Sequence, residues 1–246
     1  MPDRTAELAP AAEALAMRLQ GRRIGAFALV LAEMRPIRPR SGWRYVRISL
    51  RDRRGRISAG SLMTGIVSAG GRGVKPWIEC RLFPIVRCGP GDSRADSGDS
   101  DDSIKARALG LEAEMVELLG DLIPLGGHLM IDYENPGQEE TFAELGLRVP
   151  PPASYLGSLM FQAGFRGEFK DWYFSEGGHE GPRKLQANKS PDRAAARRAL
   201  ANHRRELSAF VARKLPADAA QAEIVARAQT RARRLLTLCG GRARAD

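Results

Sequence analysis

Residues 170–189 hold a dense group of side chains that can do acid–base chemistry. Asp171, Tyr173, Glu176 and His179 lie close together in the sequence, beside a run of glycines. Forming an amide bond needs a group that takes a proton from the attacking amine, and each of these side chains can fill that role. The alternative interpretation is a structural hairpin whose charges are solvated.

Two short strands are expected to hold this group in place. The aromatic run 172–174 and residues 184–189 are typical of strands, and the glycines between them permit a turn. Glu134 is a rival base because it lies at the end of another predicted strand, although a charge there is also typical of a solvated cap. We expect Trp172 and Tyr155 to contact the substrate.

The rest of the chain predicts an α+β fold with a mixed sheet. Apolar residues at three- and four-residue spacing predict helices over residues 5–20, 104–122, 139–145, 155–163, from 190 onward and 218–238. Alternation and β-branched residues predict strands over residues 43–50, 57–67, 77–86 and 128–133. Gly164 is expected to end one helix, and Ser190 to cap the helix that follows.

Charge is distributed in blocks along the 246 residues. The net charge of +10 combines −2 over residues 1–17, +12 over residues 18–81, −11 over residues 82–182 and +11 over residues 183–246. Two basic blocks around an acidic middle suit a polyanion such as nucleic acid. The alternative is an arginine- and alanine-rich composition that reflects the genome and no particular partner.

Basic residues recur on the polar faces of the last two predicted helices. We therefore divide the chain into a domain over residues 1–189 and a basic helical appendage over residues 190–246. The residues expected to contact RNA phosphates are Arg183, Lys184, Arg197, Arg198, Arg204, Arg205, Arg227, Arg231 and Arg234. The alternative is a pair of solvated amphipathic helices packed on the sheet.

Several classes of site are not indicated by the sequence. The three cysteines and three histidines lack the spacing of metal ligands, and an odd cysteine count argues against a disulfide framework. No apolar run approaches the length of about 20 residues that crosses a bilayer. We expect a cytoplasmic protein without a metal and without contact with a membrane.

The order of elements resembles the GNAT acyltransferase superfamily over about residues 22–189. Met160-Phe-Gln-Ala-Gly-Phe165 is similar to the phrase that ends a helix before the sixth strand in that superfamily. Lys170-Asp-Trp-Tyr-Phe-Ser-Glu-Gly-Gly178 resembles a small uncharacterised bacterial and archaeal family grouped with it. The resemblance implies an acyltransferase that forms an amide bond.

Two departures from the superfamily's pattern bear on the acyl donor. The expected pyrophosphate loop is replaced by residues 87–94 and an aspartate-rich segment, whose carboxylates oppose a pyrophosphate. Met160 occupies the position where the superfamily often has a tyrosine that acts as the general acid. Together with the basic helices, these departures favour aminoacyl-tRNA as donor and a small-molecule or peptide amine as acceptor. The alternatives are an acyl-CoA-dependent N-acyltransferase and a non-catalytic nucleic-acid-binding protein.

Overall fold

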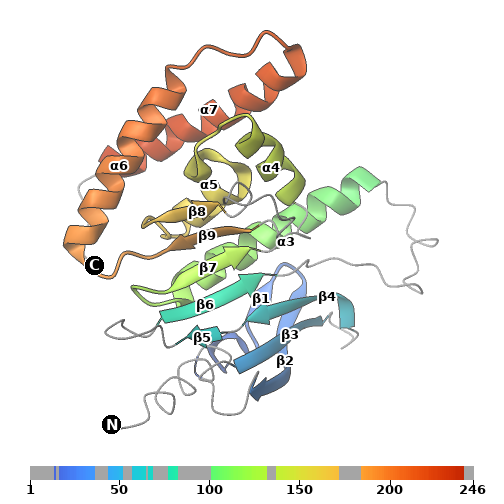
Figure 1. Ribbon diagram of the computed structural model, residues 1–246. Helices are drawn as coiled ribbons and strands as arrows, with labels where there is room; N and C mark the ends of the chain where they lie inside the picture. Colours follow the sequence, from blue (N-terminus) through green and yellow to red (C-terminus); the bar gives the residue numbers. More distant parts are fainter. Residues whose placement is uncertain are drawn as a thin grey trace.

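The computed structural model describes residues 14, 17–36, 44–51, 57–64, 66–68, 77–82, 101–131, 137–171 and 184–240 (Figure 1). Within these ranges the chain forms two sheets and a set of helices, which confirms the α+β class. None of the helices in these ranges has the length and apolar character needed to cross a membrane.

The first sheet is built from the N-terminal part of the chain and is antiparallel throughout. Its strands, in spatial order, are β1 (Arg23–Ile24), β2 (Phe27–Pro36), β3 (Arg44–Arg51) and β4 (Ile57–Thr64). The tight turn between β1 and β2 uses Gly25, whose φ of +49° is costly for a residue with a Cβ.

The second sheet is mixed. Its strands, in spatial order, are β5 (Ile66–Ser68), β6 (Trp77–Leu82), β7 (His128–Ile131), β9 (Leu185–Asn188) and β8 (Phe169–Asp171). Only β6 and β7 are parallel to each other in this sheet; the other neighbours are antiparallel. The single sheet expected from the sequence is corrected here, because β4 pairs with β3 while β5, which follows almost directly, pairs with β6.

Helices cover and connect these sheets. They are α3 (Asp101–Leu122), α4 (Gln138–Gly146), the 3-10 helix η1 (Pro151–Ala153), α5 (Tyr155–Gln162), α6 (Arg193–Val211) and α7 (Ala219–Gly240). Helix α3 supplies the long crossover that a parallel connection from β6 to β7 requires.

Local signals set the ends of several helices. The Ser154 side chain accepts a hydrogen bond from the Gly157 N–H at the start of α5, and Gly164 follows that helix with a φ of +94°. Helix α6 begins two residues later than Ser190 and Pro191 suggest. Its N-cap is Asp192, whose carboxylate accepts from the Ala195 N–H at 2.7 Å.

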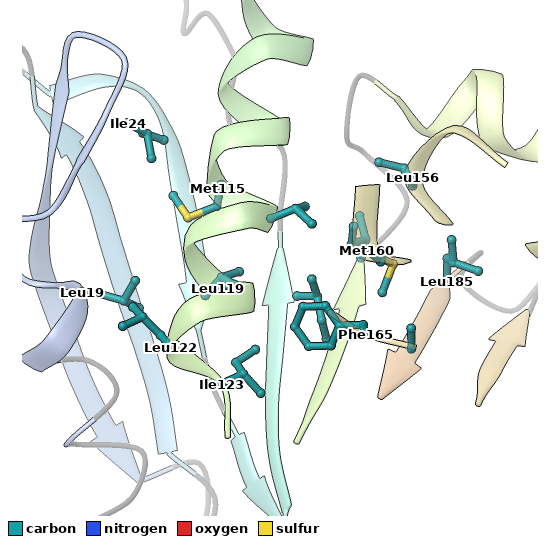
Figure 2. Close-up of a cluster of buried hydrophobic side chains, with 14 of the residues drawn as sticks. Leu19, Ile24, Met115, Leu119, Leu122, Ile123, Leu156, Met160, Phe165 and Leu185 are labelled. Atoms are coloured by element: carbon teal, nitrogen blue, oxygen red, sulfur yellow. The ribbon is translucent and has the colours of Figure 1, made fainter. Parts of the chain in front are cut away.

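The main hydrophobic core lies around α3. Met115 and Leu119 on this helix are fully buried between the N-terminal segment with Leu19 and the second sheet with Leu185 (Figure 2). Phe165 is also fully buried in this cluster. Burying a side chain of this size stabilises the fold by about 1.5–3 kcal/mol. The buried residues of this cluster therefore hold α3 against both sheets.

A second core joins the two C-terminal helices to the rest of the protein. Leu207 and Phe210 of α6 pack with Val225 and Leu235 of α7, and Phe161 of α5 belongs to the same cluster. Figure 1 shows the two helices lying side by side over α5 and the β8–β9 pair. The division of the chain at residues 189 and 190 stays a prediction.

Candidate functional site

The carboxyl ends of the parallel strands define one edge of the second sheet. Leu82, Ile131, Leu185 and Asp171 lie in register across β6, β7, β9 and β8 at this edge. Open sheets with parallel strands commonly bind ligands outside the carboxyl ends of those strands. A ligand site is therefore expected beyond this edge.

Glu112 of α3 is the most perturbed acidic group in the described part of the chain. Its side chain has no exposed surface, and its Oε2 accepts a hydrogen bond from the Gly137 N–H at 3.2 Å. Its Oε1 has no hydrogen-bond partner among the described residues. Burial raises the pKa of Glu112 to about 8, with the Gly137 bond opposing the shift, so the group is largely protonated at neutral pH.

Tyr155 lies beside this carboxyl group at the start of α5. Its ring contacts the backbone of Gly137 so closely that a Cβ at position 137 would overlap ring carbons. Burial, followed by the nearby negative charge of Glu112, raises the pKa of Tyr155 to about 12. The phenol therefore keeps its proton and can donate it in a hydrogen bond.

A second buried carboxyl group, Glu144 of α4, holds the neighbouring helices together. Its Oε2 accepts from the Tyr155 N–H at 2.7 Å, and its Oε1 pairs with the Arg231 guanidinium. Burial raises the pKa of Glu144 to about 7, although the charge and hydrogen bond of Arg231 act in the opposite direction. Arg231 also donates to the Ala153 carbonyl oxygen at 3.1 Å, so it links α7 to η1 and α4.

The structure describes only part of the predicted catalytic and substrate-binding set. Asp171 lies at the carboxyl edge, and Tyr155 lies next to Glu112. The predicted site residues that fall outside the described residues are Glu134, Trp172, Tyr173, Glu176, His179 and Arg183.

The predicted RNA-contacting residues separate into two environments. The exposed ones are Arg197, Arg198, Arg204 and Arg205 on α6 and Arg227 and Arg234 on α7. Lys184 is partly buried just before β9. Arg231 is 18% exposed, and its guanidinium pairs with Glu144 and Glu140, so its charge acts inside the protein.

Sequence reasoning missed Glu112 and Glu144 as functional candidates. A usable signal for Glu112 was present, because it lies four residues before Val116, which is fully buried. An acidic residue among apolar residues on one helix face indicates a buried carboxyl group. Among the described residues, no group of histidine, cysteine and acidic side chains has the arrangement of a metal site.

Comparison with known proteins gives a family but no activity. Residues 44–214 match the family model described as "Protein of unknown function (DUF1122)". A crystal structure of a protein of unknown function from Aquifex aeolicus VF5 is similar, with 23% identity and a TM-score of 0.57 over 87% of this chain and 97% of that one. No curated protein matches.

These findings contradict the resemblance to the GNAT superfamily. The family whose model matches is DUF1122, and the similar crystal structure is also of a protein of unknown function. The sequence motifs that suggested the superfamily were short, and proteins with unrelated activities can share one order of helices and strands.

Proposed function

The chain belongs to the DUF1122 family, whose function is unknown, and from its own geometry we propose that it is an acyltransferase that forms an amide bond. It transfers an aminoacyl group from aminoacyl-tRNA to the amine of a small molecule or peptide. The observation that carries this proposal is the buried Glu112 beside protonated Tyr155.

The proposed reaction requires two proton movements. The amine nitrogen attacks the ester carbonyl carbon, a C–N bond forms, and the C–O bond to the terminal ribose of the tRNA breaks. The amine gives up a proton and the leaving ribose oxygen receives one, so the tRNA departs with a free hydroxyl group. General acid–base catalysis of such steps contributes roughly 10²- to 10⁴-fold in rate.

Tyr155 is the proposed proton donor to the leaving oxygen. It is partly exposed, whereas Glu112 has no exposed surface, so Tyr155 is the group that touches the substrate. Glu112 is a positioning residue, because its Oε2 accepts from the Gly137 N–H and Gly137 packs against the Tyr155 ring. The group that takes the proton from the amine is proposed to be one of the catalytic residues predicted from the sequence. Of these, Asp171 lies at the carboxyl edge of the sheet.

The exposed arginines of α6 support the tRNA part of the proposal. None of Arg197, Arg198, Arg204 and Arg205 forms an ion pair with a described carboxylate, and Arg205 donates to Asn202 at 2.6 Å. Guanidinium groups on one exposed helix are suited to phosphate contacts with little sequence specificity.

The test is tRNA binding as a function of salt concentration. We expect the protein to bind tRNA at low ionic strength, with affinity that falls steeply as salt rises, because phosphate contacts release counterions. Replacing Arg204 and Arg205 with glutamate is expected to weaken binding by at least about tenfold. The same charge change at the exposed residues Arg22, just before β1, and Arg23, the first residue of β1, is the matched control.

A thermal-shift measurement with acetyl-CoA accompanies the binding test. A shift with acetyl-CoA and no binding of tRNA at low salt would replace this proposal with a CoA-dependent enzyme. Equal weakening by the two double replacements would mean that net charge, and not the α6 surface, holds the tRNA.

A further inference from the structure

A cavity of about 390 Å³ lies between η1, the start of β8, the end of β9 and the N-terminal half of α6. Phe169 and Asn188, which line it, lie at the opposite ends of β8 and β9 from Asp171 and Leu185 at the carboxyl edge. Its volume falls within the range of about 300–1,000 Å³ that is usual for small-molecule sites. The proposed acyl transfer does not use this cavity.

One wall of the cavity is apolar and fixed in position. His203 of α6 is 6% exposed, and its Nε2 lies 2.7 Å from the carbonyl oxygen of Gly167. Its Nδ1 is buried, so the ring offers a ligand a surface and no hydrogen bond. Phe169 lies nearly perpendicular to this ring, with centroids 5.6 Å apart, and is itself partly exposed. Together with Pro151 of η1, Phe169 can pack against a flat apolar group.

The rim of the cavity on α6 carries positive charge and hydrogen-bond donors. Arg198, Asn202 and Arg205 are exposed, and spacings of four and three residues place them on one face of the helix. Arg198 and Asn202 line the cavity, and Arg205 donates to the Asn202 Oδ1 at 2.6 Å. This bond leaves the amide nitrogen of Asn202 as a donor for a ligand. Two guanidinium groups beside an amide donor suit a phosphate group.

The carboxylates near the cavity do not cancel this preference for an anion. Glu168 lies 4.0 Å from the Nζ of Lys170, so a neighbouring cation offsets its charge. Glu206 lies on the side of the rim toward His203, with its Oε2 3.8 Å from the buried ring nitrogen. Its carboxylate can therefore accept a hydrogen bond from an N–H group inside the cavity, while an anionic group stays at the rim.

We propose that this cavity binds a single nucleotide, with its phosphate at the rim and its base inside. A base has the flat face that Phe169 and Pro151 can pack against, and the exocyclic amine of adenine has the N–H that Glu206 can accept. The nucleotide is either free or one unpaired nucleotide of an RNA strand, and both sources make the same contacts. The inference rests on the proposed function only for the second source.

The test uses adenosine 5′-monophosphate (AMP) as the probe, with ribose 5-phosphate and adenosine as probes that lack the base and the phosphate. Each is titrated into the full chain at low ionic strength, and calorimetry is combined with NMR of the Asn202 side-chain amide. We expect AMP to shift this amide resonance and to bind at least about tenfold more tightly than either fragment, because it makes both sets of contacts.

Ala199→Leu is the informative variant, because Ala199 lines the cavity and a leucine side chain would fill part of it. We expect this change to weaken AMP binding by at least about tenfold. Ala201→Leu adds the same side chain at an exposed position of α6 outside the cavity wall and is expected to leave the affinity within about twofold. Alanine and leucine are both good helix formers, and unfolding midpoints show whether each variant is folded.

A short oligoadenylate, used as a single strand and paired with its complement, distinguishes the two sources of the nucleotide. If an RNA strand is the ligand, we expect the single strand to bind at least as tightly as AMP and to lose affinity in Ala199→Leu, whereas the duplex loses none. Binding of AMP without this response of the single strand would assign the cavity to a free nucleotide.

Three results would overturn the assignment. They are the absence of AMP binding, binding of ribose 5-phosphate as tight as that of AMP, and equal effects of the two leucine replacements. The second result would mean that the arginines hold a phosphate and that the cavity holds no base. The probe comparison uses the wild-type protein, so it decides the assignment even without a folded Ala199→Leu. None of these measurements depends on acyl transfer, so the cavity and the proposed function fail or stand separately.

Discussion

Replacing Glu112 with glutamine tests whether a protonated carboxyl group is buried beside Tyr155. In the native protein burial raises the pKa of Glu112 from 4.5 to about 8. Between these two values the native state holds a proton that the unfolded chain has released. Stability therefore falls as pH rises through this window, and the glutamine variant lacks this loss because it does not titrate.

The size of the effect follows from the shift in pKa. Each pH unit between about 5 and 8 costs the wild-type protein about 1.4 kcal/mol of unfolding free energy through Glu112. From pH 5.5 to pH 7.5 the extra loss relative to the variant is at most about 2.5 kcal/mol. Glu144 also titrates near pH 7, but it is present in both proteins, so the difference between them isolates Glu112.

Urea unfolding followed by circular dichroism at several pH values measures this difference. Glu117→Gln is the control, because Glu117 is an exposed acidic residue on the same helix. We expect the control to follow the wild-type pH dependence and Glu112→Gln to show a flatter one. Identical pH dependence in the wild type and Glu112→Gln would refute the reasoning, since Glu112 would then be ionised in the native state.

Two further replacements test the packing around the site. Arg231→Ala leaves the Glu144 carboxyl group buried without its partner and is expected to lower the free energy of unfolding in urea by about 3 kcal/mol. The loss is expected to be larger at pH 8 than at pH 6, because a protonated Glu144 needs no cation beside it. Arg227→Ala is expected to cost less than about 1 kcal/mol, and equal costs would contradict the assignment. Gly157→Ala would push a Cβ into a backbone carbonyl oxygen and is expected to lower the melting temperature by several degrees or prevent folding. Gly146→Ala, where nothing lies within 4 Å, is expected to be neutral or slightly stabilising, and similar melting temperatures for the two alanine variants would contradict the close packing at Gly157.

Local chemistry made several elements predictable from sequence. The apolar stripe of α3 and the positive φ of Gly164 follow from residue spacing and residue type, and both are seen in the structure. The start of α6 was misplaced because Ser190 and Asp192 are both good caps. The sequence does not show which of the two carries the first turn.

Long-range pairing was the part that sequence could not supply. Strand β6 pairs with β5 and with the distant β7, which determines the mixed sheet and its edge. Glu112 acquires its raised pKa through burial in the folded core, and the bond from Gly137, 25 residues further along the chain, only partly opposes the shift. Arg231 lies four residues after the exposed Arg227 on the same helix, yet its side chain is mostly buried because it pairs with Glu144.

Transfer of label from aminoacyl-tRNA to an amine tests the central claim most directly. The full chain is incubated with tRNA charged with radiolabelled amino acids and a mixture of small primary amines, and labelled amide is measured. We expect amide that depends on both protein and amine, with formation slowed at least about tenfold in folded Tyr155→Phe. Absence of labelled amide, or an unchanged rate in Tyr155→Phe, would contradict the proposed role of this site.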